Sequence, residues 1–118
     1  MDKLCIELAE SGVEMERVMT RFMGNEALYI KFLKRFAEED KSYQDMQRYF
    51  KEESYEDAFK AAHSLKGLLA NLGLEDIMGS VAVITEKLRS GSHNGVAELM
   101  KQAEREYKNI MNILENNV

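Results

Sequence analysis

The sequence contains no proline and no tryptophan, only seven glycines and a single cysteine among 118 residues. The turn-dense composition of an all-β sandwich is therefore missing, and the plentiful Met, Leu, Ala, Glu and Lys favour helices. One cysteine, Cys5, excludes an intrachain disulfide and a cysteine-based metal cluster. We accordingly expect a helical protein from the reducing environment of the cytoplasm.

Long apolar runs and an excess of positive charge are also missing. No uninterrupted apolar run approaches the ~20 residues that cross a bilayer, and the first residues lack a signal-peptide core. The 16 Lys and Arg against 21 Asp and Glu leave a net charge of −5, which argues against binding to phosphate backbones. We expect one domain over residues 1–118 that binds neither membranes nor nucleic acid.

Apolar residues recur at helical spacing along most of the chain. Ser54 is expected to cap a helix, with Asp57 as the acidic member of a capping box, and Gly73 to end that helix in a left-handed conformation. The predicted helices cover about residues 4–8, 14–22, 26–52, 54–72, 77–88 and 94–116. Their lengths and short connections predict an all-α fold, an antiparallel four-helix bundle with one or two short N-terminal helices packed at one end.

One residue pattern in the helix over residues 54–72 is not explained by the core. At about 100° per residue, His63 lies roughly 140° from the apolar stripe and should face solvent. Lys60 and Lys66 bracket it, and such a positive patch would stabilise a phosphoryl group. Gly67 stands in mid-helix at a cost of ~1 kcal/mol relative to Ala, and Ala70 is also small. These small residues predict a face that a partner approaches closely.

The same residues form a recognisable string. His63-Ser64-Leu65-Lys66-Gly67, preceded by Ala61-Ala62 and followed by Asn71-Leu72-Gly73, resembles the signature of histidine-containing phosphotransfer (HPt) domains. The run over residues 24–36 is similar to the helix that precedes the signature in that family. The resemblance covers about residues 15–88, and the C-terminal helix matches only in pattern. Leu68-Leu69 departs from the family, many of whose members carry small residues there.

The resemblance implies a bundle whose exposed histidine accepts a phosphoryl group from a receiver-domain aspartate and passes it to another receiver. His63 would be the phosphorylated residue, Lys66 the cation beside the phosphoryl oxygens, and Gly67 the clearance for the incoming receiver. The chain would be a carrier with no cofactor of its own, because the receiver supplies Mg²⁺ and an acidic pocket. It would not be a self-sufficient enzyme.

The expected partners are response-regulator receiver domains and a hybrid sensor kinase, bound by a monomer. Phe59, at the edge of the apolar stripe, together with Lys60 and Ala70 should line the surface that the partner contacts. Whether the chain is free-standing or a module of a larger kinase stays open, although the opening Met1 favours an independent start.

Two other functions are compatible with a helical bundle. A carboxylate-bridged metal bundle needs inward Glu-x-x-His pairs, but Lys60 precedes His63 by three residues and Ser90 precedes His93 by three. His93 is expected in a loop without a role. A non-catalytic adaptor, which would bind a receiver or kinase without carrying phosphate, stays open, although a nucleophile beside a lysine and a glycine speaks against it.

Overall fold

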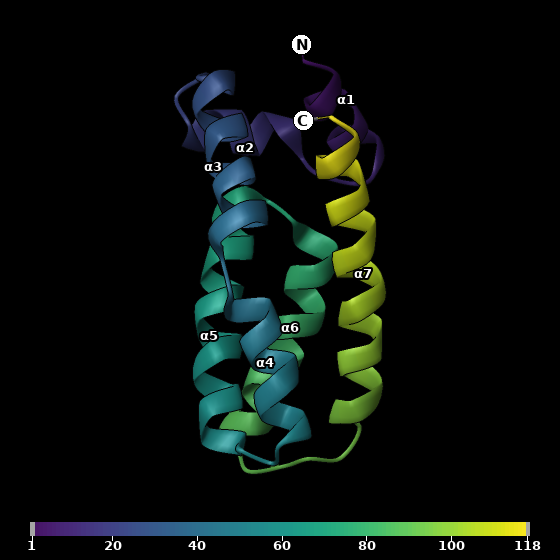
Figure 1. Ribbon diagram of the computed structural model, residues 1–118. Coiled ribbons are helices and arrows are strands. Elements are labelled where there is room, and N and C mark those ends of the chain that lie inside the picture. The colour runs from purple at the N-terminus through teal and green to yellow at the C-terminus, as the bar shows by residue number, and fades with distance from the viewer. Residues whose placement is uncertain (1, 118) are drawn as a thin grey trace.

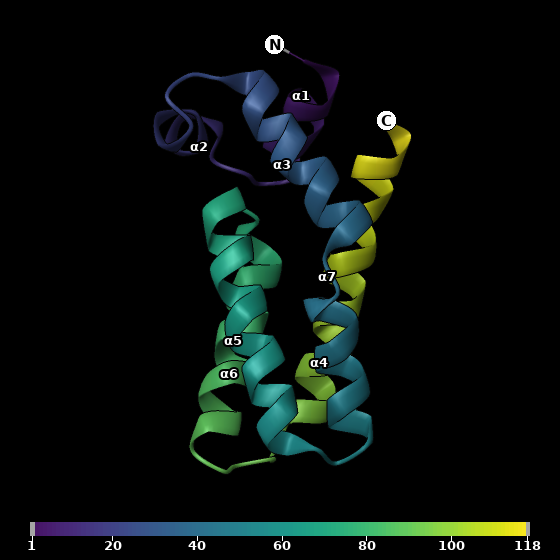
Figure 2. The same ribbon diagram turned by 60° about the vertical axis from the view of Figure 1, so that its left-hand side comes forward.

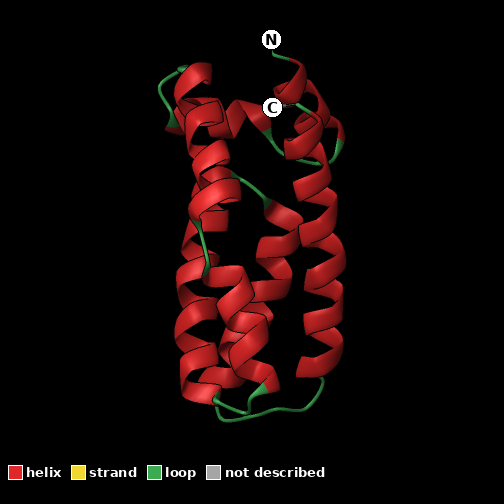
Figure 3. Ribbon diagram, viewed as in Figure 1, coloured by secondary structure: helices red, strands yellow, loops and turns green. Residues whose placement is uncertain are grey.

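The computed structural model describes residues 2–117, which form seven helices and no strand (Figures 1 and 3). Helices α4 to α7 run antiparallel along the long axis of a molecule of 43 × 25 × 22 Å, while α1 and α2 lie across one end (Figure 1). The bounds are α1 Lys3–Glu10, α2 Met15–Arg21, α3 Glu26–Glu39, α4 Ser42–Lys51, α5 Tyr55–Leu72, α6 Glu75–Arg89 and α7 Val96–Asn116. The predicted all-α bundle with short N-terminal helices at one end is confirmed.

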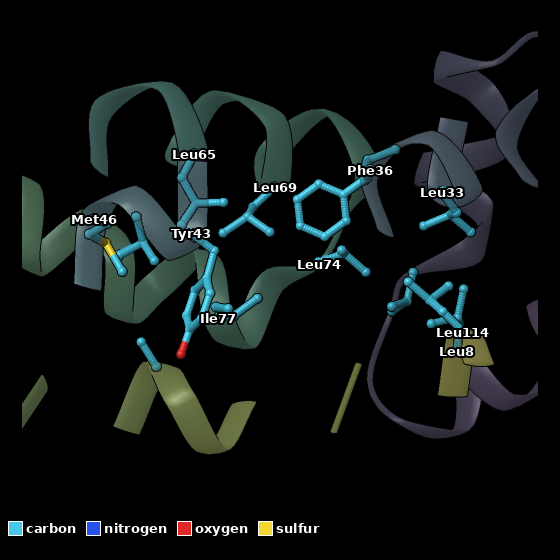
Figure 4. Packing of buried hydrophobic residues seen from close by; sticks show 14 of the residues in the cluster. Leu8, Leu33, Phe36, Tyr43, Met46, Leu65, Leu69, Leu74, Ile77 and Leu114 are labelled. Atoms are coloured by element: carbon cyan, nitrogen blue, oxygen red, sulfur yellow. The ribbon is translucent and has the colours of Figure 1, made fainter. Parts of the chain in front are cut away.

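The apolar stripe of α5 packs into the centre of the bundle. Ala58, Ala62, Leu65, Leu69 and Leu72 are all buried, as their spacing predicts. In Figure 4 the side chains of Leu65 and Leu69 point toward residues of α4 and α6. Because one face of α5 is used in this way, the opposite face is left to solvent.

The single helix predicted over residues 26–52 is wrong, because the chain breaks between α3 and α4. Asp40 has extended backbone angles, with φ −72° and ψ 134°. Its Oδ2 accepts hydrogen bonds from the backbone N–H of Ser42 at 3.1 Å and from the Ser42 hydroxyl at 2.6 Å. A carboxylate bound to the first turn of a helix stabilises a new start there. The stripe continues across the break because Phe36 and Tyr43 both face the core.

The C-terminal end of α5 follows the prediction, whereas its N-terminal end departs from it. Ser54 precedes α5, but its hydroxyl donates to Asp57 Oδ2 at 2.7 Å and accepts no backbone N–H, so the predicted capping box is wrong. Gly73 ends the helix with φ 72° and ψ 21°, and the N–H of Leu74 donates to the carbonyl of Leu69 at 3.0 Å. The left-handed cap is confirmed, and it turns the chain directly into α6.

Some apolar residues at helical spacing lie at the edge of the buried face of their helix and not at its centre. Phe32 on α3 is 37% exposed, and Leu99 on α7 is half-buried while Met100 takes the core position. The last helix begins at Val96, two residues after the predicted start. Within residues 2–117, no helix has the length and hydropathy to cross a membrane.

Candidate functional site

The solvent face of α5 carries the residues that the sequence singles out. His63, Gly67 and Ala70 are exposed and Lys66 is half-buried, while Leu65 and Leu69 between them are buried. Within the described residues, the His63 imidazole takes part in no hydrogen bond. Its ring nitrogens are therefore accessible to a partner.

The two lysines beside His63 are not equivalent. Lys60 Nζ lies 3.7 Å from Glu56 Oε1, one turn earlier on α5, with both side chains well exposed. Such an exposed pair is weak, but it compensates part of the Lys60 charge. Among residues 2–117, Lys66 has no carboxylate within 4.0 Å. Lys66 is consequently the cation that is free to bind an anion at this face.

Gly67 is not required by the packing of the bundle. It lies in the interior of α5, and a Cβ atom built on it would meet nothing within 4 Å. Ala70 follows one turn later on the same exposed face, where its carbonyl accepts a hydrogen bond from Arg21 Nη1 of α2 at 2.8 Å. The small surface next to His63 is thus open, and α2 holds the end of the helix that carries it.

Phe59 lies next to His63 on α5, and a cationic side chain of α6 contacts Phe59. The Phe59 ring is half-buried, and its centroid lies 6.0 Å from that of the imidazole, with 20° between the ring planes. Arg89 Cζ lies 5.2 Å from the Phe59 centroid, and Arg89 Nε lies 3.3 Å from Glu86 Oε1. Sequence reasoning missed Arg89. Its one signal is a basic residue in the last turn of α6.

The second histidine lies elsewhere. His93 is in the connection between α6 and α7, as predicted, and its ring stacks on Tyr55 at a centroid distance of 3.7 Å and an angle of 24°. The stack anchors the connection to the first residue of α5. Among the residues that the structure describes, no three or more His, Cys, Asp or Glu side chains come together as metal ligands.

Comparison with protein families places the site in a known sequence context. A family model described as "Hpt domain" matches residues 31–115. This range includes all of α4, α5 and α6 and nearly all of α7, so it holds the exposed face of α5 and the neighbouring edge of α6. Comparisons with curated proteins and with solved structures find no significant match.

Proposed function

The chain belongs to the Hpt domain family, and on that premise we propose that His63 accepts a phosphoryl group from a receiver-domain aspartate and passes it to a second receiver. Membership of the family implies phosphotransfer in a two-component phosphorelay and interaction with response-regulator receivers. The observation that supports His63 as the carrier is its exposed imidazole, free of hydrogen bonds, one turn from Lys66 and Gly67.

The chemistry requires little from the chain beyond an accessible nucleophile. One nitrogen of a neutral imidazole forms a bond to phosphorus as the P–O bond to the aspartyl carboxylate breaks, and the carboxylate leaves as an anion. The other ring nitrogen keeps its proton, so the phosphorylated ring is an imidazolium. No base is needed, since a neutral imidazole attacks with the lone pair of its unprotonated nitrogen. The reverse step delivers the phosphoryl group to the next aspartate.

The neighbours of His63 have separate roles in this proposal. Lys66 compensates the charge of the phosphoryl oxygens, and Gly67 leaves space for the receiver to bring its aspartyl phosphate in line with the imidazole. Lys60 and Ala70 lie on the same exposed face and contact the partner. The chain itself binds no cofactor, and the receiver contributes Mg²⁺.

Phosphoryl transfer from a receiver tests the proposal. A receiver domain from the same genome is phosphorylated with labelled acetyl phosphate and mixed with the chain. The wild-type chain should acquire an acid-labile, base-stable label, His63→Gln should acquire none, and the control His93→Gln should be labelled like the wild type. Label retained on His63→Gln contradicts the assignment. Binding of the receiver without labelling of the wild type would instead identify an adaptor.

A further inference from the structure

An imidazole that is exposed and free of hydrogen bonds has no fixed orientation of its own. In a helix, a histidine has about two accessible χ1 wells and about two χ2 wells, or about four orientations. Phosphoryl transfer needs the attacking nitrogen in line with the P–O bond that breaks, so only a fraction of these orientations is productive. A contact that selects one orientation would therefore raise the rate of transfer.

Phe59 makes such a contact with His63. The two residues are four apart on α5, a spacing that places their side chains on neighbouring turns of the same face. Their ring centroids lie 6.0 Å apart with planes 20° from parallel, which is within the range of about 4.5–7 Å for aromatic pairs. Since the imidazole plane lies close to that of the phenyl ring, this contact limits His63 to one ring plane, within which the ring can still flip by 180° about χ2.

The Phe59 ring is itself held from two directions. It is half-buried and packs against the core cluster of the bundle. The Arg89 guanidinium lies over it at 5.2 Å from Cζ to the ring centroid, and Arg89 Nε forms an exposed ion pair with Glu86 Oε1 at 3.3 Å. Helices α5 and α6 run side by side in both views of the molecule (Figures 1 and 2). A continuous set of contacts thus runs from α6 through Arg89 and Phe59 to the imidazole.

We propose that Phe59 is a positioning residue that holds the His63 imidazole in one ring plane for transfer, and that Arg89 fixes Phe59. This inference rests on the proposed function of His63. It also gives Phe59 a different role from a surface contact with the partner, because the ring acts on the nucleophile and not on the receiver.

Side-chain dynamics test the positioning directly and need no receiver. In a chain with ¹³C-labelled histidine, the His63 ring of the wild type should relax as a ring that is held in one plane. Phe59→Leu removes the ring but keeps an apolar side chain, and the His63 ring should then average over several orientations. Phe59→Tyr keeps the ring and should behave like the wild type. A His63 ring that averages equally in the wild type and in Phe59→Leu overturns the proposal.

Transfer kinetics test whether the positioning of His63 by Phe59 raises the rate of phosphoryl transfer. With a receiver that phosphorylates the wild type, Phe59→Leu should lower kcat by up to about twofold, because the number of ring orientations rises from about two to about four, and leave KM unchanged. Arg89→Met keeps the length of the side chain without its charge and should lower kcat by a smaller factor. Phosphorylation of His63 by phosphoramidate, a small donor that adapts to any orientation of the ring, should be unchanged in both variants.

A matched control exists at the other histidine. Tyr55 and His93 form a similar aromatic pair away from His63, and Tyr55→Leu removes it. This control variant should leave kcat unchanged.

If Phe59→Leu raises KM at constant kcat, the ring is a docking contact and the positioning role is wrong. If the wild type accepts label and Phe59→Leu matches it in kcat, the inference fails while the proposed function stands. If the wild type accepts none, the proposed function itself fails.

Discussion

Single side chains on the solvent face of α5 decide what chemistry this bundle can perform. The 3.6-residue period buries Leu65 and Leu69, and it therefore exposes His63 and Gly67. These placements could be predicted from the sequence because they depend on one helix only. The contact of Arg89 with Phe59 could not, since it depends on how α6 lies against α5.

Lys66→Ala should slow phosphoryl transfer and shorten the lifetime of the phosphorylated chain. The reason is the loss of a positive charge that lies one turn from His63 and has no carboxylate within 4.0 Å among the described residues. The free energy of unfolding should change by less than about 0.5 kcal/mol, because a surface substitution of this kind has little effect on stability. Lys60→Ala is the matched control and should have the smaller effect, as Lys60 is paired with Glu56 at 3.7 Å. Equal transfer rates for Lys66→Ala and wild type at low ionic strength would leave Lys66 without a role.

Gly67→Gln should stabilise the protein and impair its function at the same time. Since a Cβ at this position meets nothing within 4 Å, the better helix propensity should raise the free energy of unfolding by up to ~1 kcal/mol. The longer side chain would occupy the space in which the receiver approaches His63, so transfer should slow, and Gly67→Ala should be affected less. Urea denaturation and transfer rates measure the two effects. A Gly67→Gln variant that is destabilised yet active refutes the clearance role.

Helix boundaries depend on local contacts that the apolar pattern does not contain. The stripe continues from α3 into α4 and is interrupted only at Glu39, because Phe36 and Tyr43 face the same core, so periodicity predicts one helix. The break depends on the carboxylate of Asp40, which binds the N–H and hydroxyl of Ser42. In the sequence, an aspartate two residues before a serine is the signal that indicates this break. At Gly73, by contrast, a glycine followed by an apolar residue after the last stripe position was enough to predict the helix end.

Gly73→Ala should destabilise the protein by more than Gly91→Ala. Both glycines have left-handed backbone angles, with φ 72° and φ 78°, where a Cβ costs about 1–2 kcal/mol. At Gly91 the Cβ would lie in open space, whereas at Gly73 it would collide with Val18 Cγ2 of α2. Urea denaturation of the two variants measures the difference. Equal losses in the free energy of unfolding would mean that Val18 of α2 does not pack against Gly73 between α5 and α6.

At the scale of the whole molecule, the end formed by α1, α2 and α3 covers one end of the core and contains buried ionisable groups. Burial, followed by the charge of Glu26, raises the pKa of the Cys5 thiol from 9.0 to about 12. Burial likewise raises the pKa of Tyr43, in the bundle, from 10.0 to about 12, and the pKa of Tyr29 above its usual value. The Tyr29 hydroxyl donates to the carbonyl of Leu72 at 2.7 Å, which connects α3 to the end of α5. Folding therefore favours the neutral forms of these groups.

Alkaline pH should accordingly destabilise the fold. Since the folded pKa values lie above the unfolded ones, the stabilisation is complete below about pH 9 and is lost as pH rises through about 12. The free energy of unfolding, from urea denaturation followed by circular dichroism, should be lower at about pH 11 than at about pH 8. Cys5→Ala should lose less stability over this interval than the wild type. A free energy of unfolding that does not change between the two pH values contradicts the burial of these groups.

Because the sequence has only two histidines, one spectrum tests whether His63 carries the phosphoryl group. The chain is labelled with ¹⁵N in its imidazoles and incubated with a phosphorylated receiver domain. One ring nitrogen of His63 should shift and couple to ³¹P, while both nitrogens of His93 should stay unchanged. Coupling to ³¹P at His93, or no coupling at either ring while the receiver loses its phosphoryl group to the chain, would show that His63 is not the carrier.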